Sequence, residues 1–186
     1  MIRFFIISTF IFFQSNTKAI NMNNIQQLRK EFNLAIEDGK KANNLFDQLV
    51  KFKPANNTLQ FAYLGATEAL LAKHSYNPFS KLSYVNSALI KLNKAVELNN
   101  GNIEIRYMRF SVEANMPAYL GYSKHVDEDK KVLIQGLSTT PITVENCAMY
   151  LVFINGIINS NHCNKEEKIL LSNLEAICNK ARLIKN

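Results

Sequence analysis

The segment from residue 102 to 115 constrains the fold most, because it is predicted to be a helix with two apolar faces. Two apolar stripes with helical spacing run along it: Ile103, Tyr107, Phe110 and Ala114 form one, and Ile105, Met108 and Val112 form the other. Only Arg106, Arg109 and Glu113 remain as a polar stripe. A helix with two apolar faces is covered on both. This helix is therefore predicted to lie inside a stack of helices.

Apolar residues with a period near 3.6 predict seven further helices, and alternating strand patterns are nearly absent. The eight helices are expected at residues 24–38, 40–52, 57–73, 79–98, 102–115, 123–137, 143–159 and 164–183. The prolines and four of the glycines lie at the joints between these stretches: Pro54, Pro78, Pro117, Pro141, Gly39, Gly101, Gly121 and Gly136. There, proline starts or ends a helix, and glycine is expected as a C-cap. The sequence thus predicts an all-α fold of stacked antiparallel helix hairpins.

Residues 1–19 have the pattern of a secretory signal peptide. Arg3 precedes an apolar run from Phe4 to Phe13, and Thr17-Lys18-Ala19 places small residues at the positions that a signal peptidase reads. The run is about ten residues long, whereas a bilayer span needs roughly 20. A retained anchor and a buried first helix are the weaker alternatives. We expect an exported protein, periplasmic or associated with the cell envelope, with one helical domain over residues 20–186 and no transmembrane anchor.

The charge pattern argues against nucleic acid as a partner. The formal charge of +7 falls to +5 if the signal is removed, because Arg3 and Lys18 are lost with it. The remaining lysines are spread along the chain, without the basic stripe or recognition motif of a nucleic-acid-binding protein. An exported protein would also rarely meet nucleic acid.

The stretch from Ala88 to Arg106 resembles a tetratricopeptide repeat. Ala88, Leu92 and Ala95 have the spacing of the second helix of that repeat, and residues 98–102 resemble the turn between repeats. Asn100 and Phe110 depart from the usual residues, and Pro78 falls inside what would be the preceding first helix.

A broader resemblance covers roughly residues 60–135. Its segments are Ala62–Ala69, Asn77–Tyr84, Ile103–Ser111 and Pro117–Tyr122. Together they are similar to an uncharacterised family of short, exported, tetratricopeptide-like helical proteins of gram-negative bacteria. The resemblance implies a helical-repeat fold and export. The family has no assigned activity, so the resemblance leaves the function open.

No catalytic, cofactor-binding or metal-binding residues are predicted. His125 and Asp129 have the i, i+4 spacing of helix-borne metal ligands, but Asp127 and Glu128 do not share their face. Carboxylates in the first turns of a helix are also favoured by the helix dipole, and we prefer that interpretation. No serine or cysteine nucleophile can be matched with a base and a residue that orients it.

The three cysteines predict one candidate disulfide. Cys147 lies early in the seventh helix and Cys178 late in the eighth, so in an antiparallel pair they lie at the same level. They could form a bridge in an oxidising compartment, or remain core thiols. Cys163, in the loop, is expected to be free. A zinc site with His162 lacks the usual paired cysteine spacing.

The predicted function is a protein- or peptide-binding scaffold without catalysis. Stacked helix pairs form extended concave surfaces that suit such partners. A small-ligand carrier or enzyme with a pocket between helices, and a purely structural envelope component, remain as alternatives. The candidate partner-binding residues are Arg106, Arg109 and Glu113, because two arginines three residues apart can bind a carboxylate. The structural alternative pairs Arg109 with Glu113, and Arg106 with Asp127 or Glu128.

Overall fold

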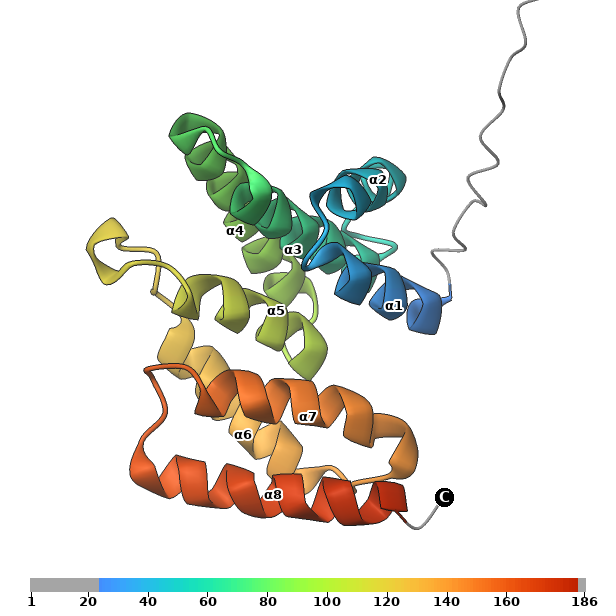
Figure 1. Ribbon diagram of the computed structural model, residues 1–186, viewed down its shortest axis with the longest axis vertical. Helices are drawn as coiled ribbons and strands as arrows, with labels where there is room; N and C mark the ends of the chain where they lie inside the picture. The colour runs from blue at the N-terminus through green and yellow to red at the C-terminus, as the bar shows by residue number, and fades with distance from the viewer. Residues whose placement is uncertain (1–23, 184–186) are drawn as a thin grey trace, which may run out of the picture.

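The computed structural model describes residues 24–183, so the predicted export signal lies outside the described residues. The described chain consists of eight α-helices and one 3-10 helix, without strands (Figure 1). The elements are α1 (Ile25–Ala35), α2 (Gly39–Leu49), α3 (Thr58–His74), α4 (Pro78–Leu98), α5 (Ile103–Ala114), η1 (Ala118–Leu120), α6 (Val126–Thr139), α7 (Val144–Ile158) and α8 (Lys165–Leu183). The all-α prediction is confirmed, and each helix begins and ends within three residues of its expected position. None of the helices between residues 24 and 183 is long and apolar enough to cross a membrane.

Side-chain caps fix where most of these helices begin. The side chains of Asn24, Asp38, Asn77 and Asn102 each accept hydrogen bonds from two backbone N–H groups in the first turn of their helices. Thr143 and the helix residue Asn146 form a reciprocal capping box at the start of α7. These groups satisfy N–H donors that have no partner within the helix, so the helix starts are encoded locally.

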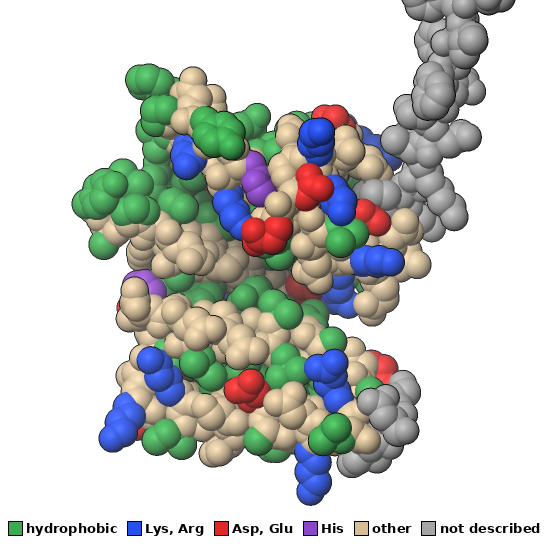
Figure 2. Space-filling view, in the orientation of Figure 1, with side chains coloured by type: hydrophobic (Ala, Val, Ile, Leu, Met, Phe, Trp, Pro, Cys, Tyr) green, Lys and Arg blue, Asp and Glu red, His purple; other side chains and the backbone are tan. Residues whose placement is uncertain are grey.

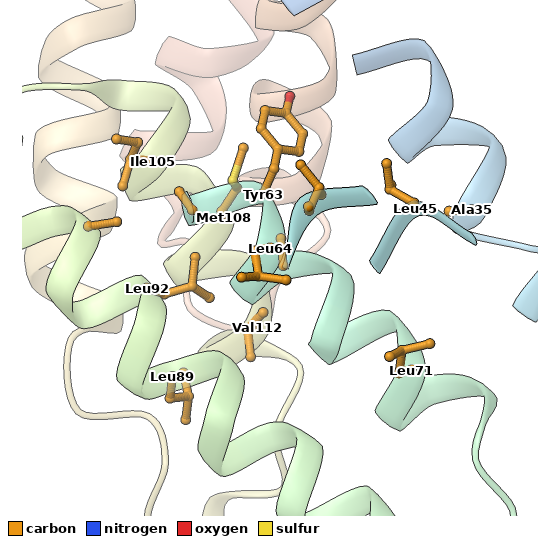
Figure 3. Close-up of a cluster of buried hydrophobic side chains, with 14 of the residues drawn as sticks. Ala35, Leu45, Tyr63, Leu64, Leu71, Leu89, Leu92, Ile105, Met108 and Val112 are labelled. Carbon is orange, nitrogen blue, oxygen red and sulfur yellow. The ribbon is translucent and has the colours of Figure 1, made fainter. Parts of the chain in front are cut away.

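Successive helices pack as hairpins (Figure 1). Their buried side chains form two hydrophobic clusters that meet at α5. The first cluster is built from α1 to α5, and Figure 3 shows side chains from it, including Leu64, Leu92 and Met108. The second cluster is built from α5 to α8, with Tyr150, Phe153 and Ile154 of α7 buried in it. Helix α7 thus contributes more buried side chains to the second cluster than any other helix.

The prediction that residues 102–115 form a helix inside the stack is confirmed. The stripe of Ile105, Met108 and Val112 belongs to the first cluster. The stripe of Ile103, Tyr107, Phe110 and Ala114 belongs to the second. Each apolar face of α5 thus packs into a different half of the molecule.

The sequence suggested that the four glycines at the joints are helix C-caps, and this is wrong for two of them. Gly121 ends η1 with a φ of 68°, the conformation that favours glycine. Gly39 is instead the first residue of α2. Gly136 lies inside α6, where a Cβ atom would be 2.6 Å from Ile103 Cγ2. It therefore allows close packing between α6 and α5 rather than ending a helix.

Candidate functional site

Arg106 and Arg109 are buried in ion pairs, so the expected accessible site at these residues is wrong. Their exposed fractions are 6% and 4%. Both guanidinium groups bind the carboxylate of Asp129 on α6, which is completely buried, and Arg106 also binds Glu128. Arg109 additionally donates to Asn93 Oδ1 on α4, at 3.1 Å. The polar stripe of α5 is buried because α4 and α6 cover the third side of this helix.

Glu113 has a different partner from the one expected. It does not pair with Arg109, whose guanidinium is directed to Asp129. Its carboxylate accepts a hydrogen bond from the backbone N–H of His125 and contacts His125 Nδ1, both at 2.7 Å. It is 1% exposed. Glu113 thus ties the connection before α6 to α5 and has a structural role.

The described residues contain no group of three or more His, Cys, Asp or Glu side chains that could hold a metal ion. His125 and Asp129, the pair with metal-ligand spacing, are directed to Glu113 and to the arginines respectively. The carboxylate of Glu128 accepts a hydrogen bond from Arg106, which lowers its pKa. The acidic side chains at the start of α6 thus serve ion pairing between helices.

Cys147 and Cys178 lie against each other between α7 and α8, as the antiparallel arrangement predicted. Both side chains are fully buried. Burial and this contact raise the pKa of Cys178 to about 12. All three cysteines are free in the structure, and Cys163 is partly exposed near the start of α8. The disulfide between Cys147 and Cys178 stays a prediction.

A groove of about 490 Å³ is lined by α1, α3, α5 and α7. These are the first helices of the four hairpins, while the second helices do not contribute to it. Figure 2 shows the molecule hollowed across its middle, between the N-terminal helices and the α7–α8 layer, with hydrophobic side chains along the hollow. We call this concavity the inter-hairpin groove.

Apolar and aromatic side chains make up most of the groove's lining. The apolar ones are Phe32, Leu34, Tyr63, Ala66, Tyr107, Met108, Ala148, Met149, Val152 and Phe153. Phe32 meets Tyr63 edge to face at 5.2 Å between ring centroids, and Tyr107 stacks on Phe153 at 4.4 Å. These pairs hold the floor in a fixed shape. Val152, on the α7 side, is 51% exposed and is therefore available to a ligand.

One polar cluster interrupts the apolar floor. Arg29 of α1 donates two hydrogen bonds to the carboxylate of Glu104 on α5, at 2.7 and 2.6 Å. The hydroxyl of Tyr63, on α3, donates to the same carboxylate at 2.6 Å. The hydrogen bond to Glu104 raises the pKa of Arg29, while burial and the Glu104 charge raise that of Tyr63. The three groups satisfy one another and join three of the groove helices.

A second hollow of about 180 Å³ adjoins the groove at the α5–α7 contact. The two hollows share Tyr107 and Ser111 in their linings. The Tyr107 hydroxyl donates to the backbone carbonyl of Val152 at 3.1 Å, which fixes the ring between them. Polar side chains, including Asn115 and Asn159, line the smaller hollow. The lining therefore changes from apolar to polar past Tyr107.

The groove residues were not predicted, although the sequence contained part of the signal. Tyr107 and Met108 were assigned to the two apolar stripes of residues 102–115. Periodicity indicates that such residues face neighbouring helices. It does not indicate where two helices that are not sequence neighbours leave a space between them.

Comparison with known proteins does not supply a function. No protein-family model, no curated protein and no solved structure matches the chain. The candidate function therefore rests on the geometry of the groove.

Proposed function

We propose that this chain is a tetratricopeptide-like binding module that holds an apolar segment of a protein partner in the inter-hairpin groove. The observation that carries the proposal is that one helix from each of the four hairpins lines a single concave surface. Stacked helical hairpins bind peptides and proteins on such surfaces. The expected export to the periplasm or cell envelope is part of this proposal, and the partner would be met there.

The lining favours a partner with apolar side chains. The groove presents Met108 and Met149, which adapt to ligands of different shape because the methionine side chain is flexible and polarizable. The polar cluster of Arg29, Tyr63 and Glu104 is internally satisfied, so it holds the helices together and leaves recognition mainly to the apolar walls. Lys30, exposed on the α1 rim, adds a positive charge that suits a carboxylate next to the apolar residues.

A pair of matched substitutions tests the proposal. Twelve-residue peptides would be selected from a random display library against the full chain, and their affinities measured by calorimetry. Val152→Asp places a charge in the groove, whereas Ile177→Asp changes a residue of α8 that is equally exposed, at 52% against 51%. We expect Val152→Asp to weaken binding at least about tenfold, since an unpaired carboxylate would be desolvated by the bound segment. Ile177→Asp should not change it.

The proposal fails if no peptide is enriched, or if Ile177→Asp weakens binding as much as Val152→Asp. Circular dichroism on both variants would establish that the fold is retained.

The volume of the groove also favours a second candidate, a carrier of a small apolar ligand. A volume of about 490 Å³ falls within the range of small-molecule sites. The cluster of Arg29, Tyr63 and Glu104 adds polar groups to the otherwise apolar floor. A fluorescent apolar probe, anilinonaphthalene sulfonate, distinguishes the two functions. Tight probe binding that Val152→Asp abolishes, without any enriched peptide, would favour the carrier.

A further inference from the structure

Three of the most exposed large apolar side chains in the described chain lie at two turns, far from the groove lining. Tyr76 and Phe79 lie at the α3–α4 turn and are 101% and 83% exposed, and Tyr119 of η1 is 86% exposed. Both turns project from the same side of the molecule (Figure 1), and hydrophobic side chains protrude there in the space-filling view (Figure 2). These aromatic rings contribute nothing to the core.

The two turns belong to one surface. The hydroxyl of Tyr122 donates to Asn86 Oδ1 on α4 at 2.7 Å, which holds the η1 connection against that helix. Phe79, Leu82, Asn86 and Ile90 have i, i+3 and i, i+4 spacing, so they lie along one face of α4. Of these, Leu82 and Ile90 are also exposed, as is Leu120 of η1. We call this surface the aromatic edge, formed by Tyr76, Phe79, Leu82, Ile90, Tyr119 and Leu120.

The chain around the aromatic edge carries only positive charge. Residues 69–96 and residues 114–126 contain no aspartate or glutamate. Three lysines of these stretches, Lys73, Lys91 and Lys94, form ion pairs with carboxylates outside them. Their partners are Glu37, Glu68 and Glu97 respectively. Lys81, two residues from Phe79, and Lys124, two residues from Tyr122, form no ion pair with any described residue. The aromatic edge is therefore flanked by unpaired cations.

We propose that the aromatic edge binds peripherally to the surface of an anionic lipid bilayer. Aromatic side chains with a polar tip, such as tyrosine, are enriched where membrane meets water. Lysines beside them would be attracted to anionic head groups. The two protruding turns and the exposed face of α4 can enter the head-group region while the other helices stay outside it.

A single tryptophan at the aromatic edge tests the proposal in the full chain. The protein contains no tryptophan, so Phe79→Trp introduces one reporter at the edge, and Ile177→Trp introduces a matched one on α8. With vesicles of phosphatidylcholine and phosphatidylglycerol in equal parts, the emission of Phe79→Trp should shift to the blue. Brominated lipids should quench it. Ile177→Trp should show neither change, because its indole on α8 would stay in water when the aromatic edge is bound.

Two further variants test the two contributions in the Phe79→Trp background. Lys81→Gln with Lys124→Gln should raise the lipid concentration needed for half-maximal shift by about 25-fold, from about fivefold for each lysine. Tyr76→Ser with Tyr119→Ser should raise it by at least about tenfold, since two exposed rings are lost from the contact. Both pairs are exposed or partly exposed, and thermal unfolding should be unchanged.

Three results would overturn the proposal. One is the absence of a blue shift with anionic vesicles, and another is an equal shift of Ile177→Trp. The third is a shift that depends on protein concentration without lipid, which would assign the aromatic edge to self-association.

Discussion

The carboxylate of Asp129 accepts two hydrogen bonds from the guanidinium of Arg109, at 2.7 Å to Nε and 2.8 Å to Nη2. It accepts a third from Arg106 Nη1, at 2.8 Å. Because Asp129 is completely buried, these bonds replace its contact with water and join α5 to α6. The charges of the two arginines are balanced by Asp129 and by Glu128 at the rim of the cluster.

Asp129→Asn should lower the free energy of unfolding by about 3–5 kcal/mol, because it leaves buried guanidinium charge without its partner. Asp127→Asn is the matched control, since the Asp127 side chain is 91% exposed. It should change stability by less than about 0.5 kcal/mol. Urea unfolding followed by circular dichroism measures both. Similar, small losses in the two variants would mean that the cluster does not stabilise the α5–α6 contact.

Gly156→Ala should destabilise the protein, although alanine usually stabilises a helix relative to glycine. A Cβ atom at this position would overlap the hydroxyl of Tyr107 and lie 2.8 Å from its Cε2. We expect a loss of about 1–3 kcal/mol in thermal or urea unfolding, from displacement of the Tyr107 ring.

The double variant Gly156→Ala with Tyr107→Phe tests that cause, because removing the hydroxyl removes the closest overlap. Its loss in the free energy of unfolding should be smaller than the sum of the losses in the two single variants. Gly101→Ala is the control, since nothing lies within 4 Å of its Cβ position. Additive losses would indicate that the α5–α7 contact is not responsible.

Under oxidising conditions Cys147 and Cys178 should form a disulfide, with Cys163 left free. In refolding with oxidised glutathione, the two thiols would be oxidised to the disulfide while glutathione is reduced. The bridge closes a loop of about 30 residues and should add about 3–4 kcal/mol to the free energy of unfolding. Peptide mapping after alkylation identifies the linked pair. The expectation is wrong if Cys163 is found in the disulfide, or if Cys163→Ser prevents its formation.

Stability should decrease as the pH rises above about 9, with a contribution from Cys178. The pKa of this thiol is about 12 in the folded chain, against an ordinary value of 9.0. Above pH 9 the unfolded chain therefore releases a proton that the folded chain keeps, which favours unfolding. The stabilisation is complete below pH 9 and is lost as the pH approaches 12. Burial also raises the pKa of Tyr107, which acts in the same direction.

Cys178→Ala isolates this contribution. The difference in the free energy of unfolding between the unmodified chain and Cys178→Ala, measured with reductant present, should narrow as the pH rises from 9. A difference that stays constant across this range would show that the thiol keeps the same pKa on unfolding.

The sequence was sufficient to predict the helices and the position of α5, for a physical reason. Helix boundaries depend on local caps such as Asn77 and Asn102, and burial of a face depends on 3.6-residue spacing. Both signals are contained within a short stretch of chain. The two stripes of α5 therefore identified its two clusters correctly.

The pairing of charges was not predicted correctly, because it depends on how α6 is rotated against α5. Arg106 was matched with Asp127 or Glu128. It pairs with Glu128, but its other partner is Asp129 rather than Asp127. Asp129 shares the buried stripe of Val126 and Leu133, which was the available sign that it faces the core. The inter-hairpin groove depends on helices far apart in sequence, and no local pattern contains it.

The most direct test of the account is methyl nuclear magnetic resonance of the full chain labelled at the methionine methyl groups. Met108 and Met149 line the inter-hairpin groove, whereas Met116 packs beside the first hydrophobic cluster and does not. On addition of a peptide selected against the protein, we predict shifts of the Met108 and Met149 signals and no shift of Met116. A peptide that binds while the Met108 and Met149 signals stay unchanged would contradict binding in the groove.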